Sequence, residues 1–187
     1  MKKLLLIIAA LFFLFIFISI LGWYPVAIVN GRFISYSAWR SAEHAERQFI
    51  TAQKLKNGGK EINLNESAAS EFLVTIRRST LTFLIEDAIF KGEGERMIHG
   101  FAQESKQRVA RALEYGQNVA AAAKALYGLN RDDFIALVLL PQARRDVIRE
   151  YLAEQGKGFD EWALEIKKHT HVQLFLVPFT WDGEEVK

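Results

Sequence analysis

The chain has 187 residues, with 24 Lys and Arg against 22 Asp and Glu, and it contains no cysteine. When Lys2 and Lys3 are set aside, 22 basic side chains remain against 22 acidic ones. A nucleic-acid partner would require a basic excess, so none is predicted. The lack of cysteine excludes a disulfide scaffold, thiol catalysis and cysteine-ligated metal. Only three prolines are present, which favours long helices.

The segment Leu4–Leu21 has no charge and a single polar residue, Ser19. As a helix rising ~1.5 Å per residue, it can cross a hydrocarbon core of about 30 Å. Lys2 and Lys3 precede it, which predicts a single-pass anchor in the lipid bilayer of the cytoplasmic (inner) membrane, with the rest of the chain on the extracytoplasmic side. The alternative is a signal peptide cleaved near Gly22, although the run is long and offers a poor cleavage site.

The chain is expected to divide into three parts. Residues 1–24 form the transmembrane anchor or uncleaved signal, and residues 25–181 form one helical domain large enough to bury its own core. Residues 182–187 form a polar tail, which we expect to be frayed.

The domain begins with a strand signal, because Val26–Val29 is a short apolar run rich in β-branched residues. Asn30-Gly31 follows and is a strong signal for a tight hairpin turn, from which residues 32–34 return. Ser35 is a good N-cap for a helix over residues 36–55, which the Asn57-Gly58-Gly59 stop signal ends.

Capping residues and glycines set the bounds of the later helices. These helices are predicted over residues 65–91, 95–115, 119–127, 131–154 and 159–168. Gly92-Glu93-Gly94 is expected to form a hinge-like break, and Pro141 to kink or break its helix near Leu140. Asn118 and Asn130 are expected to cap the helices that follow them.

Residues 171–177 are apolar and β-like, and Pro178 ends the run. This strand needs a partner, and the other good candidate is Val26–Val29. We therefore expect the two ends of the domain to meet. The predicted fold is mainly α, an N-terminal transmembrane helix followed by a helical domain whose ends are joined by a small two-stranded sheet.

The sequence offers little support for catalysis. His169 and His171 would share one face of a strand and suggest a metal site, but no third ligand lies near them in sequence. No serine lies in a nucleophile elbow, and no glycine pattern matches a phosphate loop or dinucleotide turn. Glu86 and Asp87 are adjacent, so on a helix they point about 100° apart and do not form a dyad. We predict no catalytic, cofactor-binding or metal-binding residue, and no cofactor.

Aromatic residues are unusually frequent, with 14 Phe and four Trp. Most should fill the core, but long helices over a small sheet leave shallow grooves between them. The residues predicted to line a peptide-binding groove are Trp39, Phe49, Phe72, Phe83 and Phe90. An apolar groove rimmed by charge suits unfolded chains, because apolar burial is non-directional and tolerates varied sequences.

The order of these segments resembles the N-terminal chaperone domain of exported foldases of the SurA, PrsA and PpiD type. VAIVNGRFIS at residues 26–35 is similar to the opening of that domain, and LTFLIEDAIF at residues 81–90 to one of its helices. Residues 134–152 look like its later helix, and residues 172–177 like its returning strand. The parvulin-type isomerase domain of such foldases has no counterpart here, so the resemblance implies chaperone activity and no enzyme.

The function expected from these features is a membrane-anchored, extracytoplasmic chaperone-like module. Its partners would be apolar segments of unfolded or nascent exported polypeptides, bound without covalent chemistry. Two alternatives stay open. One is a structural or assembly subunit that docks on a single partner in a membrane complex, and the other is a peptidyl-prolyl isomerase, by transfer from the family.

Overall fold

The computed structural model describes residues 22–58, 67–116 and 118–187 of the chain. Over these ranges the protein is mainly helical and carries one small antiparallel sheet. The predicted anchor, Leu4–Leu21, lies outside the described residues. Within the described ranges, no helix combines the length and the hydropathy needed to cross a membrane.

The sheet has three strands in the spatial order β2-β1-β3, all antiparallel. Their bounds are β1 (Pro25–Val29), β2 (Arg32–Ser35) and β3 (Val172–Leu174). Ala27 at the centre lies opposite Ile34 on one side and Leu174 on the other. The prediction that the two ends of the domain meet is thus confirmed. The predicted number of two strands is wrong, because the segment that returns from the hairpin turn forms a strand of its own.

The hairpin turn and the first helix cap form as predicted. Asn30 and Gly31 adopt φ values of 48° and 81°, the positive pair that a type I′ turn requires. The Ser35 hydroxyl then accepts a hydrogen bond from the Ala38 amide at 3.2 Å, at the start of the first helix. The cap marks the passage from sheet to helix, and the Tyr36 and Ser37 amides also donate to the Tyr24 and Gly22 carbonyls at 3.0 Å.

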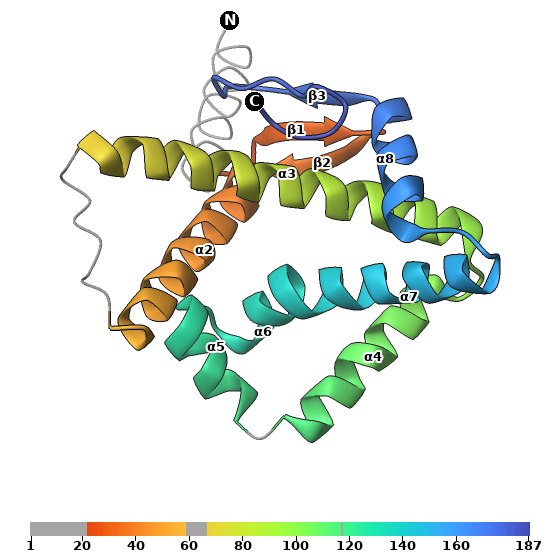
Figure 1. The fold of residues 1–187 in the computed structure, drawn as a ribbon, viewed down its shortest axis with the longest axis horizontal. Coiled ribbons are helices and arrows are strands. Elements are labelled where there is room, and N and C mark those ends of the chain that lie inside the picture. Colours follow the sequence, from red (N-terminus) through yellow and green to blue (C-terminus); the bar gives the residue numbers. More distant parts are fainter. Residues whose placement is uncertain (1–21, 59–66, 117) are drawn as a thin grey trace, which may run out of the picture.

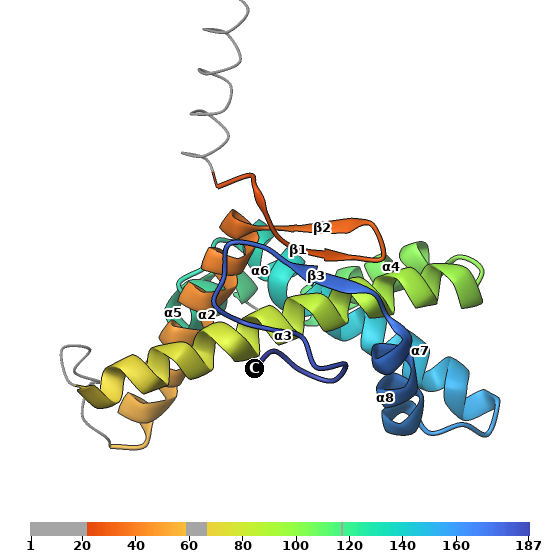
Figure 2. The same ribbon diagram turned by 90° about the horizontal axis from the view of Figure 1, so that it is seen from above.

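The helices follow in two groups along the chain. The first group is α2 (Tyr36–Lys56), α3 (Ser67–Met97), α4 (Phe101–Tyr115) and α5 (Val119–Tyr127). The second group is α6 (Arg131–Phe134), the π-helical turn η1 (Ile135–Leu139), α7 (Leu140–Glu154) and α8 (Phe159–His169). The long α3 passes along the sheet, and both α2 and α7 pack against it (Figures 1 and 2). α5 packs on α2, and α4 packs on α7.

The core lies where α3 meets the sheet and α7. Leu81 and Ile85 of α3 are fully buried, as is Ile148 of α7. Val26 and Val29 of the central strand complete this contact and are at most 1% exposed. Burial of these branched side chains from distant segments holds the sheet and the two helices together.

The hinge predicted at Gly92-Glu93-Gly94 is wrong, because α3 continues through both glycines to Met97. The chain instead turns at Gly100, whose φ is +76°, and α4 begins at Phe101. A Cβ placed on Gly94 would lie only 2.3 Å from the ring of Phe101, which is itself 2% exposed. Gly94 therefore allows α4 to approach α3 closely and does not end the helix.

We expect Gly94→Ala to destabilise the fold by about 1–3 kcal/mol, since the buried Phe101 ring has no room to move. Gly92→Ala is the matched control, two residues earlier in the same helix. Its new methyl group meets only the flexible Arg32 side chain at 3.4 Å, so the variant should gain up to about 1 kcal/mol from helix propensity. Urea unfolding measures both changes, and equal effects would contradict this assignment.

Pro141 perturbs its helix as predicted, but the perturbation is a π-helical turn and not a sharp break. In η1 the Leu140 amide donates to the Ile135 carbonyl, five residues earlier. Pro141 has no amide hydrogen, and in a regular helix its ring would clash with the carbonyl four residues earlier. The wider turn before Pro141 shifts the backbone away from this clash. Asn130 caps the segment as predicted, its side chain accepting from the Asp133 amide at 2.8 Å. Asn118 has φ +70° and makes no side-chain cap, so that prediction is wrong.

The C-terminal segment also differs from prediction. Strand β3 ends at Leu174, earlier than predicted, and Leu176 adopts φ +56°. The tail expected to be frayed packs on α3 instead. Val186 is only 3% exposed, and its amide donates to the Thr82 hydroxyl at 3.0 Å. One buried valine and one hydrogen bond to a distant helix outweigh the polar composition of the tail.

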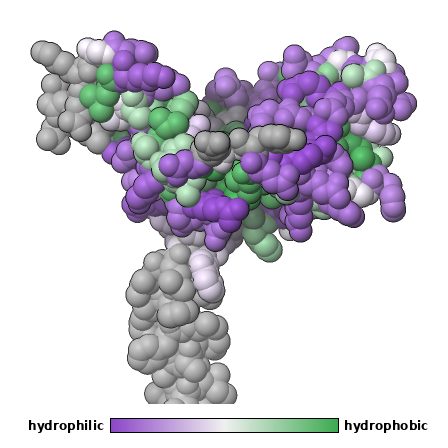
Figure 3. All heavy atoms as spheres, turned by 90° about the horizontal axis from the view of Figure 1, so that it is seen from below, coloured by the Kyte–Doolittle hydropathy of each residue, from purple (hydrophilic) through white to green (hydrophobic). Residues whose placement is uncertain are grey.

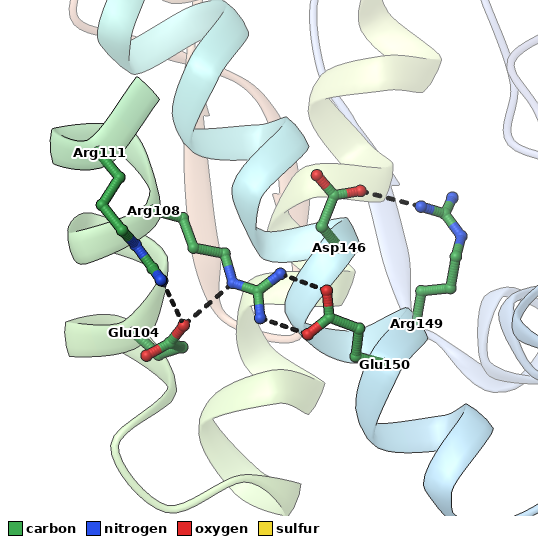
Figure 4. A network of polar contacts seen from close by, with 6 residues as sticks. All are labelled: Glu104, Arg108, Arg111, Asp146, Arg149 and Glu150. Carbon is green, nitrogen blue, oxygen red and sulfur yellow. Dashed lines mark hydrogen bonds and ion pairs between the residues drawn. The ribbon is translucent and has the colours of Figure 1, made fainter. Parts of the chain in front are cut away.

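Charged side chains link α4 to α7 (Figure 4). Arg108 donates to both carboxylate oxygens of Glu150, at 2.7 and 2.5 Å, and to Glu104 at 3.1 Å. The hydrogen bond from Arg108 lowers the pKa of Glu150 below its usual value. This contribution to stability is present at neutral pH and is lost as the pH falls and Glu150 takes up a proton. It is small, since Glu150 is largely exposed.

Candidate binding groove

A groove of about 470 Å³ opens between α2, α3, α5, η1 and α7. Much of its wall consists of small side chains from α2 and aromatic side chains from α2, α3 and α5. The π-helical turn η1 adds three consecutive aliphatic residues. These residues are Ala45, Phe49, Phe83, Tyr127 and Leu137–Leu139. Seen from below, hydrophobic residues gather in the middle of the molecule, and hydrophilic residues predominate toward the right-hand end (Figure 3).

Ring contacts shape the end of the groove nearest α5. Phe49 of α2 and Tyr127 of α5 stack with ring centroids 4.8 Å apart and planes only 5° from parallel. Phe134 of α6 also contacts Tyr127, with ring centroids 5.3 Å apart. Gly128 ends α5 with φ +68° and lets the chain pass close to His44 and Gln48 of α2. The close approach of α5 to α2 therefore fixes the aromatic wall.

The π-helical turn contributes the opposite wall. Leu137, Val138 and Leu139 all line the groove, and each remains half-buried. In a regular helix, consecutive residues point about 100° apart, so three in a row seldom face one surface. The wider π-helical turn before Pro141 accompanies this arrangement. The neighbouring Ala136 is exposed and is not part of the groove wall.

Two charged side chains line the groove, and they differ in environment. Arg145 donates to Glu86 at 3.0 Å, and its guanidinium lies 4.7 Å from the centre of the Phe83 ring. Glu46 of α2 has no hydrogen bond or ion pair within the described part of the chain. Burial raises the pKa of Glu46, and burial together with the Glu46 charge raises the pKa of Tyr127. The groove thus holds an acid without a cationic partner.

We expect Glu46→Gln to stabilise the protein at neutral pH. The pKa of Glu46 in the folded state lies above its ordinary value of 4.5. The contribution of Glu46 to folding is therefore most favourable below pH 4.5, and it becomes less favourable as the pH rises through the raised pKa. The amide carries no charge and removes this penalty, so the gain should vanish near pH 4. Unfolding curves at both pH values measure the difference. Glu165→Gln, at an exposed position on α8, should have no such pH-dependent effect.

The structure brings together two of the five predicted groove residues, Phe49 and Phe83. Trp39 is instead 6% exposed, and its indole N–H donates to the Arg77 carbonyl at 3.1 Å. Phe90 is 3% exposed and packs on aromatic residues of α8. The expectation that these two line a groove is corrected, since both point into the core. Phe72 is half-buried on α3 and does not belong to the groove wall.

Sequence reasoning missed the η1 wall, Tyr127 and the role of Glu46. The helical spacing of Trp39, Ala42 and Phe49 leaves either Ala45 or Glu46 on the same side of α2, and this spacing is the available signal for a half-buried acid. Pro141 signalled a local distortion, but nothing near it in sequence indicated that residues 137–139 would face α2. The predicted H-x-H pair does not lie on one strand either, because His169 ends α8 and His171 precedes β3.

Comparison with known proteins adds no assignment: no family model, curated protein or solved structure matches the chain. The groove is therefore the feature of the molecule from which a function can be proposed. Its chemistry is that of a binding site, with an apolar wall, two half-buried charges and an opening to solvent. Across the described ranges, no three acidic or histidine side chains are grouped so as to hold a metal ion.

Proposed function

We propose that the protein is a membrane-anchored, extracytoplasmic chaperone-like module that binds apolar segments of unfolded or newly exported polypeptides without covalent chemistry. The groove between α2, α3, α5 and η1 is the observation that supports this proposal. The membrane anchor is proposed from Leu4–Leu21 alone, and the extracytoplasmic orientation from Lys2 and Lys3.

The groove suits a polypeptide segment for two physical reasons. When any apolar side chain covers its aliphatic and aromatic walls, the free energy falls by about 25 cal/mol for each Å² of apolar surface removed from water. This gain needs no fixed hydrogen-bonding pattern, so one groove can accept many sequences. An anchored module would also hold its binding site close to chains that emerge at the membrane, which raises their effective concentration.

The test uses the full chain in lipid nanodiscs and a client protein diluted from denaturant, with aggregation followed by light scattering. A several-fold excess of the protein should suppress aggregation, whereas empty nanodiscs should not. No suppression would count against the proposal. Crosslinking separates this function from an assembly role, because many weak partners fit a chaperone and one stoichiometric partner fits a subunit. Turnover in a proline-peptide isomerisation assay would favour the isomerase alternative.

A matched pair of variants assigns this activity to the groove. Val138→Asp places a charge in the groove wall and should abolish most of the suppression, because an ionised carboxylate is costly to cover with apolar side chains. Ala136→Asp adds the same charge to the same π-helical turn at an exposed position and should leave suppression unchanged. Circular dichroism checks that both variants stay helical. Equal activity of the two variants would remove the groove from the proposal.

A further inference from the structure

The two charged residues of the groove wall do not pair with each other. Arg145 donates to Glu86, which also accepts from Lys167 at 2.9 Å. Its guanidinium is covered by the Phe83 ring on one side and lies 5.5 Å from the Phe90 ring centre. Glu46 is the other charged residue of the wall, and among the described residues its carboxylate forms no ion pair.

Basic side chains on the elements around Glu46 are engaged elsewhere or exposed. On α2, Arg47 lies 3.9 Å from Glu43, and Arg77 of α3 lies 3.4 Å from the same carboxylate oxygen. On α5, Lys124 is exposed, and Tyr127 presents its ring to Phe49. Within the described ranges, no cation therefore pairs with Glu46.

A half-buried carboxylate without a partner is a costly group, and a ligand can remove that cost by supplying a cation. Phe49 and Tyr127 stack at the same end of the groove, and aromatic faces also attract Arg and Lys side chains. A ligand that fits this wall thus combines apolar side chains with a positive charge. An acidic segment would be repelled.

We infer that the groove selects apolar polypeptide segments that carry a lysine or arginine side chain, and that this cation pairs with Glu46. The inference rests on the proposed function and names its preferred clients. Apolar residues next to the basic side chain cover the walls at Phe83 and Val138, while Glu46 supplies specificity through a charge-assisted hydrogen bond at a half-buried position.

The test compares two fluorescent peptides on the full chain in nanodiscs of uncharged lipid. One is Ser-Gly-Leu-Phe-Arg-Leu-Phe-Gly-Ser, and the other has citrulline, a neutral analogue of nearly the same shape, in place of arginine. Fluorescence anisotropy should give about tenfold tighter binding of the arginine peptide, the size expected of a charge-assisted hydrogen bond. Equal affinity for the two peptides would overturn the inference and leave the proposed function standing.

Two variants locate the preference. Glu46→Gln should bind both peptides as the wild type binds the citrulline peptide, which also shows that the variant is folded. Glu165→Gln, at an exposed position on α8, should keep the tenfold preference. A preference that survives in Glu46→Gln would overturn the role of Glu46. Binding of neither peptide to the wild type would end both the inference and the proposed function, and tighter binding of a fluorescent long-chain alcohol would assign the groove to lipid.

Discussion

Leu81→Ala is expected to lower the free energy of unfolding by about 3–5 kcal/mol, among the largest effects of any single truncation in the chain. Leu81 is fully buried, on the face of α3 that packs in the core with the sheet and α7. Its removal leaves a cavity that neighbouring side chains cannot fill, because strand, helix and turn are already in contact there. The loss of stability is the sum of two costs, the transfer free energy of the removed side-chain atoms and the free energy of the cavity that remains.

Urea unfolding followed by tryptophan fluorescence measures this change, since Trp39 and Trp162 both belong to the same core cluster. Leu164→Ala provides the control. Leu164 lies on α8 and is 38% exposed, so the same truncation should cost less than about 1 kcal/mol. If Leu164→Ala destabilised the protein as much as Leu81→Ala, the assignment of the core to this face of α3 would fail.

Arg144→Met is expected to cost about 3–5 kcal/mol, because it leaves Asp87 without its cation. The Arg144 guanidinium lies 2.5 Å from one Asp87 oxygen, and the two side chains are only 13% and 18% exposed. The other Asp87 oxygen is buried and has no hydrogen-bond partner among the described residues. Loss of Arg144 would therefore leave a mostly buried carboxylate between α3 and α7 with no partner.

A second substitution tests this cause. Adding Asp87→Asn to Arg144→Met removes the stranded charge and should recover more than half of the lost stability, measured by the same unfolding curves. Arg111→Met on α4 is the control for loss of an arginine. Its ion pair with Glu104 is exposed, so it should cost less than about 1 kcal/mol (Figure 4). A double variant no more stable than Arg144→Met alone would exclude the ion pair as the source.

The helix α3 serves the core and the groove through different faces. Leu81 and Ile85 are fully buried in the core, whereas Ser79 and Phe83 line the groove. On a helix, residues two apart lie about 200° from each other, so the two sets alternate along the chain and point apart. On α3, stability and the proposed binding should therefore respond to separate substitutions.

Features decided within a few residues could be predicted from sequence. Asn30-Gly31 requires a tight hairpin because both residues accept positive φ, and Ser35 and Asn130 cap helices with their own side chains. The mainly helical class and the meeting of the first and last strands also followed from local pattern and from the scarcity of strand signals. For the turn, the caps and the helical class, the energetic preference lies in the segment itself. The pairing of the two end strands was predicted because each needed a partner and the other was the good candidate.

Features that depend on a distant partner could not be predicted in the same way. In the sequence Gly94 looks like a helix break, but in the structure it makes room for the Phe101 ring. The polar tail likewise looks disordered in the sequence, but in the structure its Val186 is buried against α3. Trp39 and Phe49 occupy similar positions in the helical pattern of α2, yet one enters the core and the other the groove. Local sequence was enough for most helices, the hairpin turn and the caps at Ser35 and Asn130. Which faces meet could be seen in the folded structure alone, because burial depends on neighbours that are far away in the chain.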